Sequence, residues 1–166
     1  MARKVFFSFH YIADNWRVSQ IRNMHALEEN CPVSDNEWEQ IKKGGDHAIS
    51  RWIDGQMWGK SCLIVMAGSG TANRKWVNYE IAKAWNDGKG VMGIRIHGLK
   101  DRNGNTSLGG ANPFDYLTEK NANKRLSNFV TLYDPTSIWG SSETYANIKK
   151  NLAGWVEEAI KSRERL

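Results

Sequence analysis

Residues 61–85, SCLIVMAGSGTANRKWVNYEIAKAW, decide the fold of this chain. The stretch begins with an apolar run at 62–66, breaks at the small residues 67–71, and continues over 74–86 with apolar residues at helical spacing. A buried strand, a turn of small residues and a helix form one half of an α/β unit. Because open α/β sheets bind their ligands at the carboxyl ends of the strands, this turn predicts where a functional site lies.

The first segment of the chain predicts a strand followed by a helix. Residues 4–9, KVFFSF, are expected to form the first and central strand, and residues 10–14 a loop. Asp14 or Asn15 is expected to cap a helix that starts near Trp16, because short polar side chains accept hydrogen bonds from the free N–H groups of a first turn.

Two interruptions precede the deciding stretch. Residues 30–36 include a proline and form a break, and a glycine pair stands at 44–45. Residues 37–43 fit either a turn of helix or a short edge element. Asp46 is expected to cap the next helix. Its apolar face consists of Ala48, Ile49, Trp52, Ile53 and Met57.

The remaining segments continue the alternation of strands and helices. Glycines at 88–90 are expected to end the helix that precedes them. The later elements are a strand at 91–96, a long polar loop at 98–113, a strand at 129–132 and a helix at 145–163. Alternating strands and helices favour an α/β fold with a doubly wound parallel sheet and helices on both faces. We expect a single domain over residues 1–166.

Composition restricts the class of protein. The chain has 166 residues, of which 40% are hydrophobic and 25% charged, as in globular proteins. The net charge of +5 is compatible with an anionic ligand, but no basic run predicts nucleic-acid binding. No apolar segment reaches membrane-spanning length, and the first residues do not form a signal peptide. Two cysteines, Cys31 and Cys62, are too few for a disulfide framework, so a cytoplasmic location is expected.

The eight tryptophans are many for this length, and large aromatic side chains usually serve the core or a partner surface. Trp52 and Trp155 fall on apolar helix faces. Both are therefore expected to be core residues and not ligand contacts.

The turn Gly68-Ser-Gly-Thr-Ala-Asn73 nearly matches the dinucleotide pattern G-x-G-x-x-G, with asparagine in place of the third glycine. The alternative is a plain turn with Thr71 or Asn73 as a helix cap. Either form can present backbone N–H groups to a phosphate. A phosphoacceptor receiver domain is not supported, because its acidic residues are missing after the first strand and at the end of the later one.

Few side chains suggest catalysis by their type alone. The four histidines lack metal-ligand spacing, so no metal site is expected; only His10 lies where a strand end meets the predicted cleft. No serine has the G-x-S-x-G setting of an acyl-transfer hydrolase. Glu80 follows Trp76 by four residues and shares its helix face. In the ordinary interpretation, Glu80 is exposed to solvent and Trp76 belongs to the core. In the functional interpretation, the two form an acidic and aromatic pair at the edge of the sheet where ligands bind.

Four segments together carry a resemblance to a known family. They are KVFFSFHY at 4–11 with Asp14, KGGDHAISRWID at 43–54, TANRKWVNYEI at 71–81 and GIRIHGLKD at 93–101. As a set they resemble the TIR-like family of small bacterial proteins, in particular the TIR subunits of the Thoeris anti-phage systems. The resemblance covers roughly residues 3–135.

The resemblance implies a flavodoxin-like fold and an enzyme that cleaves NAD, which is its substrate and not a bound cofactor. Trp76 and Glu80 match the tryptophan and glutamate of catalytic TIR domains, which makes Glu80 the expected catalytic residue. Such Thoeris proteins cyclise the ADP-ribose into a diffusible signal for a separate effector protein. The substrate's phosphates are expected over the turn Gly68 to Thr71, with Ser69 and Thr71 as binding residues, and over the end of the first strand. Phe9, His10 and Tyr11 are expected to stack on a base or on nicotinamide.

Two alternatives stay open: a non-catalytic TIR-like module that senses a partner or binds nucleotide, and a hydrolase that yields only linear ADP-ribose. The resemblance also suggests a phage-derived trigger and a homo-oligomer. Two departures matter. The Arg-Asp box of receptor TIR domains is absent between residues 30 and 45, and the loop at 98–113 is unlike compact TIR domains. That loop is expected to be costly to order and to shape the product or a partner surface. The purified protein is therefore expected to show little NAD turnover alone, and more with a phage-derived trigger or forced association.

Overall fold

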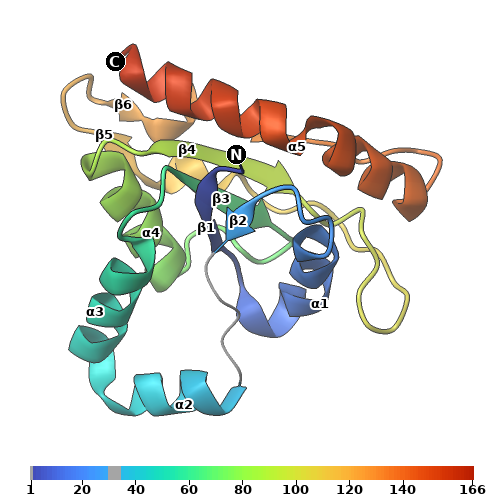
Figure 1. Ribbon diagram of the computed structural model, residues 1–166, viewed down its shortest axis with the longest axis horizontal. Coiled ribbons are helices and arrows are strands. Elements are labelled where there is room, and N and C mark those ends of the chain that lie inside the picture. Colours follow the sequence, from blue (N-terminus) through green and yellow to red (C-terminus); the bar gives the residue numbers. More distant parts are fainter. Residues whose placement is uncertain (1, 30–34) are drawn as a thin grey trace.

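A computed structural model describes residues 2–29 and 35–166, and its ribbon shows a twisted sheet between helices (Figure 1). The sheet has five parallel strands in the order β2-β1-β3-β4-β7. These strands are β1 (Lys4–Ser8), β2 (Glu28–Glu29), β3 (Cys62–Ala67), β4 (Gly90–Arg95) and β7 (Leu132–Tyr133). The helices are α1 (Tyr11–Arg22), α2 (Asp35–Lys43), α3 (Gly45–Met57), α4 (Lys75–Asn86) and α5 (Ser141–Glu164). The predicted doubly wound α/β fold is confirmed.

The central strand is β3, not β1, so the expectation for residues 4–9 is wrong on this point. All six residues of β3 are buried, and β3 pairs with β1 on one side and with β4 on the other. The outer neighbour of β1 is the two-residue strand β2. The longest fully apolar strand therefore takes the middle of the sheet, where both of its faces are covered.

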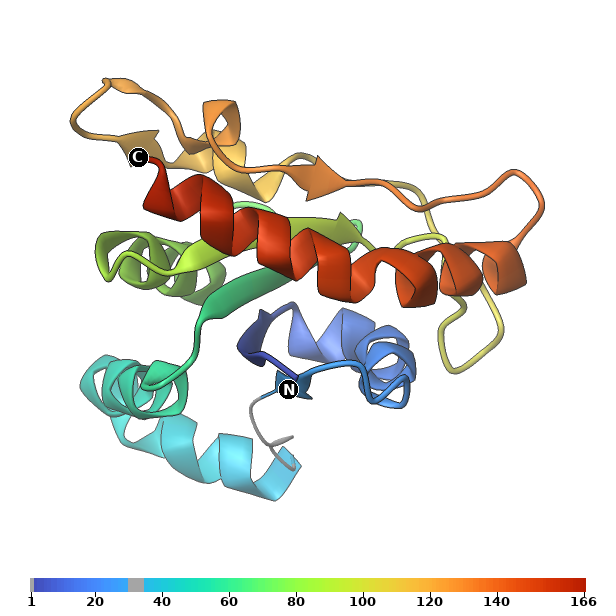
Figure 2. The same cartoon turned by 45° about the horizontal axis from the view of Figure 1, so that its top comes forward.

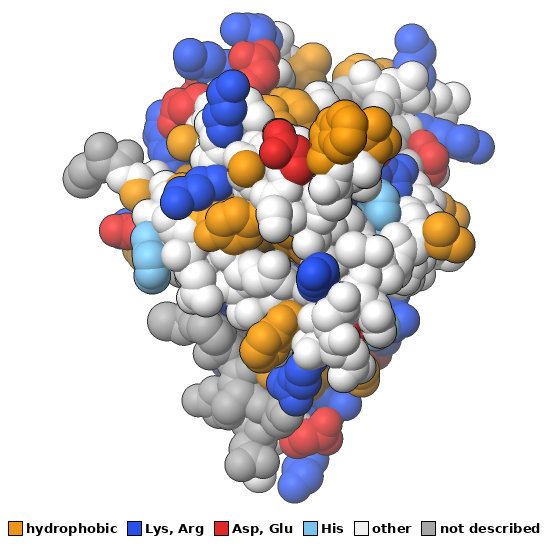
Figure 3. Space-filling model, turned by 90° about the vertical axis from the view of Figure 1, so that its right-hand side faces the viewer, with side chains coloured by type: hydrophobic (Ala, Val, Ile, Leu, Met, Phe, Trp, Pro, Cys, Tyr) orange, Lys and Arg blue, Asp and Glu red, His pale blue; other side chains and the backbone are white. Residues whose placement is uncertain are grey.

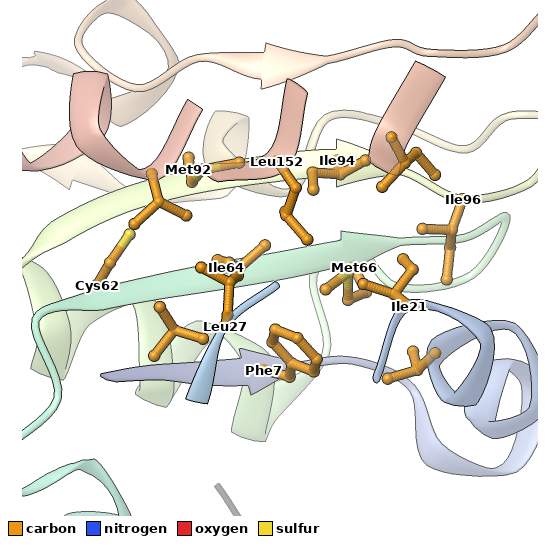
Figure 4. Packing of buried hydrophobic residues seen from close by; sticks show 14 of the residues in the cluster. Phe7, Ile21, Leu27, Cys62, Ile64, Met66, Met92, Ile94, Ile96 and Leu152 are labelled. Atoms are coloured by element: carbon orange, nitrogen blue, oxygen red, sulfur yellow. The ribbon is translucent and has the colours of Figure 1, made fainter. Parts of the chain in front are cut away.

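Helices cover both faces of the sheet and form two separate cores. On one face α1 and α5 pack on alternate strand residues, and Figure 4 shows Ile21 and Leu152 from these helices against Ile64 and Met92. On the other face α3 and α4 pack on the remaining alternate residues. This alternation follows from the two-residue period of a strand. Figure 2 shows α5 lying along β4, its main partner in the sheet.

The predicted helix caps are wrong at two places. Helix α1 begins at Tyr11, and Asp14 lies in its first turn, buried against Arg17 instead of capping the helix. Helix α3 follows Gly44, and Asp46 pairs with Lys75 of α4 instead of capping α3. In both cases an ion pair with a side chain further along the chain replaces the local hydrogen bond.

Other local expectations are settled by the helix and strand bounds. Residues 37–43 belong to the helix α2, which resolves the alternatives left open there. Part of the break at 30–36 lies outside the described residues, and so does Cys31. Cys62 is a free thiol in the buried strand β3, and burial raises its pKa to about 12, so it acts as a small hydrophobic residue.

The last elements differ modestly from expectation. The final strand is β7, so it begins at Leu132 and not at residue 129. Before it come two short 3-10 helices and a two-stranded hairpin that the sequence did not predict. These are η1 (Pro113–Tyr116), β5 (Thr118–Glu119), β6 (Lys124–Arg125) and η2 (Leu126–Asn128). Trp155 of α5 is partly buried and stacks on Tyr133 with ring centroids 4.5 Å apart, as its predicted core position requires. Within the described residues, no helix is both long and apolar enough to cross a membrane.

The loop at 98–113 has no helix or strand until η1 begins, yet it is tied to the body of the protein. The Arg17 guanidinium donates to the carbonyls of Leu99 and Asn105 at 2.9 and 3.0 Å. Asp101 accepts from the backbone N–H of Asn105, and Arg95 donates to the carbonyl of Gly110. The expected cost of ordering this loop is therefore already met within the chain.

Figure 3 shows the face that carries this loop and the amino-terminal end of α5, with hydrophobic side chains in separate patches among polar and basic ones. Leu108, Ile138 and Trp139 are among the exposed hydrophobic residues. Scattered apolar side chains are ordinary on protein surfaces, so they do not by themselves mark a binding site.

Gly93, in the middle of β4, is needed for the packing of η1 and β7. A Cβ at this position would lie 2.8 Å from Leu132 Cδ1 and 2.9 Å from Phe114 Cε2. We expect Gly93→Ala to destabilise the fold by about 1–3 kcal/mol through overpacking. Gly154→Ala in α5, where nothing lies within 4 Å, should instead stabilise it by about 0.5–1 kcal/mol. Urea unfolding measures the free energy of unfolding of both variants. If Gly93→Ala were as stable as the wild type, the register of β4 in the structure would be wrong.

Candidate functional site

A cavity of about 590 Å³ opens beside the carboxyl end of β1, at the edge of the sheet where the sequence predicted a site. Its walls come from β1, the start of α1, and the helices α2, α3 and α4. Its lining residues are Phe6, Phe7, Phe9, His10, Tyr11, Ile12, Arg22, Trp38, Lys42, Ile49, Trp52, Ile53, Asn73, Arg74, Lys75, Trp76, Val77 and Glu80. Five of the seven predicted site residues are in this set.

Glu80 is the acidic residue of the cavity. It lies in α4 one turn after Trp76, and both side chains line the cavity, which confirms their shared helix face. Only 8% of Glu80 is exposed, and burial raises the pKa of its carboxyl well above the ordinary value. The hydroxyl of Ser8 lies beside it and offsets part of this rise, although it makes no hydrogen bond of regular geometry. A buried carboxyl with a raised pKa in a cavity is typical of a functional group.

Aromatic rings form much of the wall around this carboxyl. The rings of Phe9 and Tyr11 lie 6.1 Å apart, and those of Trp38 and Trp52 lie 6.0 Å apart. Trp52 is only partly buried and faces the cavity, so the prediction that it belongs to the core alone is wrong. Trp52 lies about one helical turn after Ile49 and directly before Ile53, and both isoleucines are buried, so this side of α3 serves both core and cavity.

Basic side chains outnumber acids along the cavity. Arg22, Lys42, Arg74 and Lys75 line it, whereas Glu80 is the acid in the described lining. The cations are held by neighbours: Lys75 pairs with Asp46, and Arg74 donates to the Gly70 carbonyl at 2.8 Å. Positive charge combined with aromatic rings suits an anionic ligand that carries planar groups, such as a nucleotide.

His10 lies between the end of β1 and the basic side chains that line the cavity. It precedes α1, lines the cavity, and its Nδ1 atom is buried without a hydrogen-bond partner in the described part of the chain. Burial lowers the pKa of His10, and the positive charge of Arg74 lowers it further. The imidazole is thus neutral at neutral pH, with a ring nitrogen free to bond a ligand.

We expect Arg74→Gln to raise the pKa of His10 towards its ordinary value, because one of the two causes of its depression is removed. The measurement is a proton NMR titration of the His10 ring. Lys149→Gln, a charge loss on the exposed side of α5, should leave the titration unchanged. An unmoved His10 midpoint in the Arg74 variant would show that the two side chains are farther apart than the structure places them.

The structure does not bring the other two predicted residues to the cavity. Thr71 is fully buried, and its hydroxyl accepts from the Gly68 N–H at 2.8 Å while it faces the Met66 carbonyl. Ser69 is exposed and lies outside the lining. The turn also leaves no room for larger residues, since a Cβ on Gly68 would lie 2.2 Å from an Asp14 oxygen. Thr71 therefore shapes the turn, and α4 begins after Arg74 and not at a Thr71 or Asn73 cap.

Several residues of the site were missed from the sequence. Arg74 and Lys75 directly precede Trp76, so the pattern that identified Glu80 could have drawn attention to them. Ser8 could have been found from the alternation of β1, which points it away from Phe7. Trp38 had no local signal, because its place depends on how α2 folds against α3.

The strand order and the site together define a class of protein. The order β2-β1-β3-β4-β7 is the flavodoxin-like order, and a tryptophan and a glutamate of the fourth helix face a cavity at the end of the first strand. This is the arrangement of a TIR-like α/β domain. Residues 6–101 match the family described as "Thoeris protein ThsB, TIR-like domain". The match spans more than half of the chain, and the chain belongs to this family.

A relative from Bacillus cereus (strain MSX-D12) carries the name "Putative cyclic ADP-D-ribose synthase ThsB1". It is 42% identical to this chain over 123 residues, which are 70% of this chain. The chain spans 64% of that relative's length. The family resemblance found in the sequence is confirmed by these matches.

Proposed function

We propose that this protein cleaves the N-glycosidic bond of NAD and cyclises the resulting ADP-ribose into a signal for anti-phage defence. The observation that carries the proposal is the Glu80 carboxyl, buried in a cavity walled by aromatic rings and basic side chains. The name of the Bacillus cereus relative, "Putative cyclic ADP-D-ribose synthase ThsB1", supports the same reaction.

The residues suit the chemistry of this bond. When the bond breaks, nicotinamide leaves with the bonding electron pair, and positive charge develops on the ribose as in glycoside cleavage. An ionised Glu80 beside that ribose stabilises the charge in a site of low dielectric constant. The raised pKa of free Glu80 is compatible with this role, because the cationic nicotinamide ring of bound NAD favours the ionised carboxylate.

The fate of the ribosyl cation decides the product. A nucleophilic atom of the same ADP-ribose can bond to the anomeric carbon and release its proton to solvent, which gives a cyclic product. Water attack gives linear ADP-ribose instead. The rings of Phe9, Tyr11 and Trp76 offer stacking surfaces that fold the dinucleotide back on itself and exclude water. The phosphates would then meet Arg74 and Lys75 at the rim, and not the turn residues Ser69 and Thr71.

The cyclic product would act on a separate effector protein of the same defence system, by diffusion and without a stable complex. A phage-derived trigger and assembly of several copies would regulate it. The tied loop at 98–113 removes one reason for expecting the isolated chain to be inactive, so basal turnover is the better expectation for the purified protein.

The test is incubation of the purified protein with NAD, followed by chromatography of nicotinamide and of the ribosyl product. We expect release of nicotinamide and a cyclic ADP-ribose isomer. Linear ADP-ribose alone would identify a hydrolase. The assay is repeated with lysate of infected cells and at raised protein concentration. If NAD binds but no nicotinamide is released under any of these conditions, the result would support the non-catalytic module.

A further inference from the structure

Ser8, the last residue of β1, carries a buried polar group with no evident structural use. The residue is fully buried, and its hydroxyl has no hydrogen-bond partner of regular geometry within the described residues. An unpaired buried hydroxyl costs stability, and native proteins keep few of them. The position therefore calls for an explanation.

Strand geometry shows where the hydroxyl points. Ser8 is paired in register with Val65 of β3, and Val65 belongs to the core under α3 and α4. Phe6, two residues earlier, packs in the same core, whereas Phe7 packs in the core on the other face. Ser8 therefore faces α4, the helix that carries Glu80.

We propose that Ser8 is a positioning residue for Glu80, with its hydroxyl donating a hydrogen bond to the Glu80 carboxylate when the cationic nicotinamide ring of NAD occupies the site. This inference rests on the proposed NAD cleavage and names a further residue of the same site. This hydrogen bond would hold the carboxylate from the side of β1, while its other side faces the cavity and the ribose. The free hydroxyl in the unliganded protein is then a donor held ready for the ionised carboxylate.

The electrostatic surroundings favour this assignment. The other charged or titratable groups that line the cavity are His10 before α1, Arg22 on α1, Lys42 on α2, and Arg74 and Lys75 around the start of α4. Burial is the main cause of the raised pKa of Glu80, and the Ser8 hydroxyl offsets part of this rise. Removal of the Ser8 hydroxyl is therefore expected to raise the pKa of Glu80 further.

The experiment uses Ser8→Ala in the full chain, with two readouts. We expect the acid limb of the pH profile of NAD cleavage to move to higher pH. At pH values below the midpoint of that acid limb, kcat should fall about tenfold if the titration moves by one pH unit, while KM changes little. Carbon NMR titration of the Glu80 carboxyl in the unliganded protein should show its midpoint at higher pH than in the wild type.

Two variants separate positioning from packing. Ser107→Ala removes another buried hydroxyl without a partner, outside the cavity lining, and should leave profile and titration unchanged. Ser8→Thr keeps a hydroxyl and should restore most of the activity. An unmoved Glu80 titration and pH profile in a folded Ser8→Ala protein would overturn the proposal. If the wild type does not cleave NAD, the proposed function fails, while the carboxyl titration still decides whether Ser8 acts on Glu80.

Discussion

Replacing Glu80 with glutamine is expected to remove nearly all NAD cleavage and, at the same time, to make the fold more stable at neutral pH. The loss of the carboxylate removes the charge that stabilises the ribosyl cation, so activity should fall by about a hundredfold to a thousandfold. The gain in stability follows from burial, which raises the pKa of this carboxyl well above its ordinary value.

The direction of the pH effect follows from linkage. The unfolded chain ionises Glu80 near pH 4.3, whereas the folded chain keeps the proton to higher pH. The contribution of this group to stability is therefore full below about pH 4.3 and is lost as the pH rises through the folded pKa. Glutamine does not titrate, so the variant and the wild type should be equally stable at about pH 4 and differ increasingly towards pH 8.

Urea unfolding from pH 4 to 8 measures this difference, and circular dichroism checks that the fold is unchanged. Glu143→Gln, at an exposed position in the first turn of α5, is the matched control and should show neither the activity loss nor the rising stability. Full NAD cleavage by a folded Glu80→Gln protein would exclude Glu80 as the catalytic residue. A variant less stable than the wild type at pH 8 would show that the carboxylate is satisfied in the free protein.

The parts of this fold that could be predicted are those fixed by local pattern. The apolar run of β3, the small-residue turn and the spacing of α4 gave the central α/β unit and placed Trp76 beside Glu80. The position of β1 in the sheet could not be predicted, because it depends on which strand pairs on both sides. Strand order is a property of contacts between distant segments, which the pattern of one segment does not contain.

Asp14, Trp52 and Thr71 take part in contacts that the pattern of their own segments does not show. Asp14 was expected to cap a helix, but the Arg17 guanidinium takes its carboxylate and also binds carbonyls more than eighty residues away. Trp52 packs against the core as expected, and it also lies at the cavity wall beside Trp38 of the neighbouring helix α2. Thr71 was expected near the phosphates, and the structure places its hydroxyl on the backbone of the turn, outside the cavity lining. The position of the site in the fold could thus be predicted from the sequence, whereas the residues that form its walls depend on how the helices pack.

Arg17→Met is expected to cause the largest loss of stability of any single change considered for this chain. The Arg17 guanidinium is buried, pairs with Asp14 at 3.1 Å, and donates to the carbonyls of Leu99 and Asn105. Methionine leaves the Asp14 carboxylate buried without its cation, which typically costs about 3–5 kcal/mol. The loop at 98–113 also loses its link to α1, so the amide protons of Asn105 and Ser107 should exchange faster with solvent.

The pH dependence of this defect distinguishes a lost ion pair from lost packing. Burial already raises the pKa of Asp14, and Arg17 offsets part of that rise, so Arg17→Met should raise the pKa further. A raised folded pKa means that stability is retained below the unfolded pKa and lost as the pH rises, so the defect should be smaller at pH 5 than at pH 8. Asp14→Asn combined with Arg17→Met should recover much of the loss at pH 8, because no unpaired charge remains.

Arg165→Met, which breaks an exposed pair with Glu158, serves as the control and should stay near wild-type stability. A defect that is equal at both pH values and is not relieved in the double variant would mean that the aliphatic packing of Arg17, and not its charge, holds the loop.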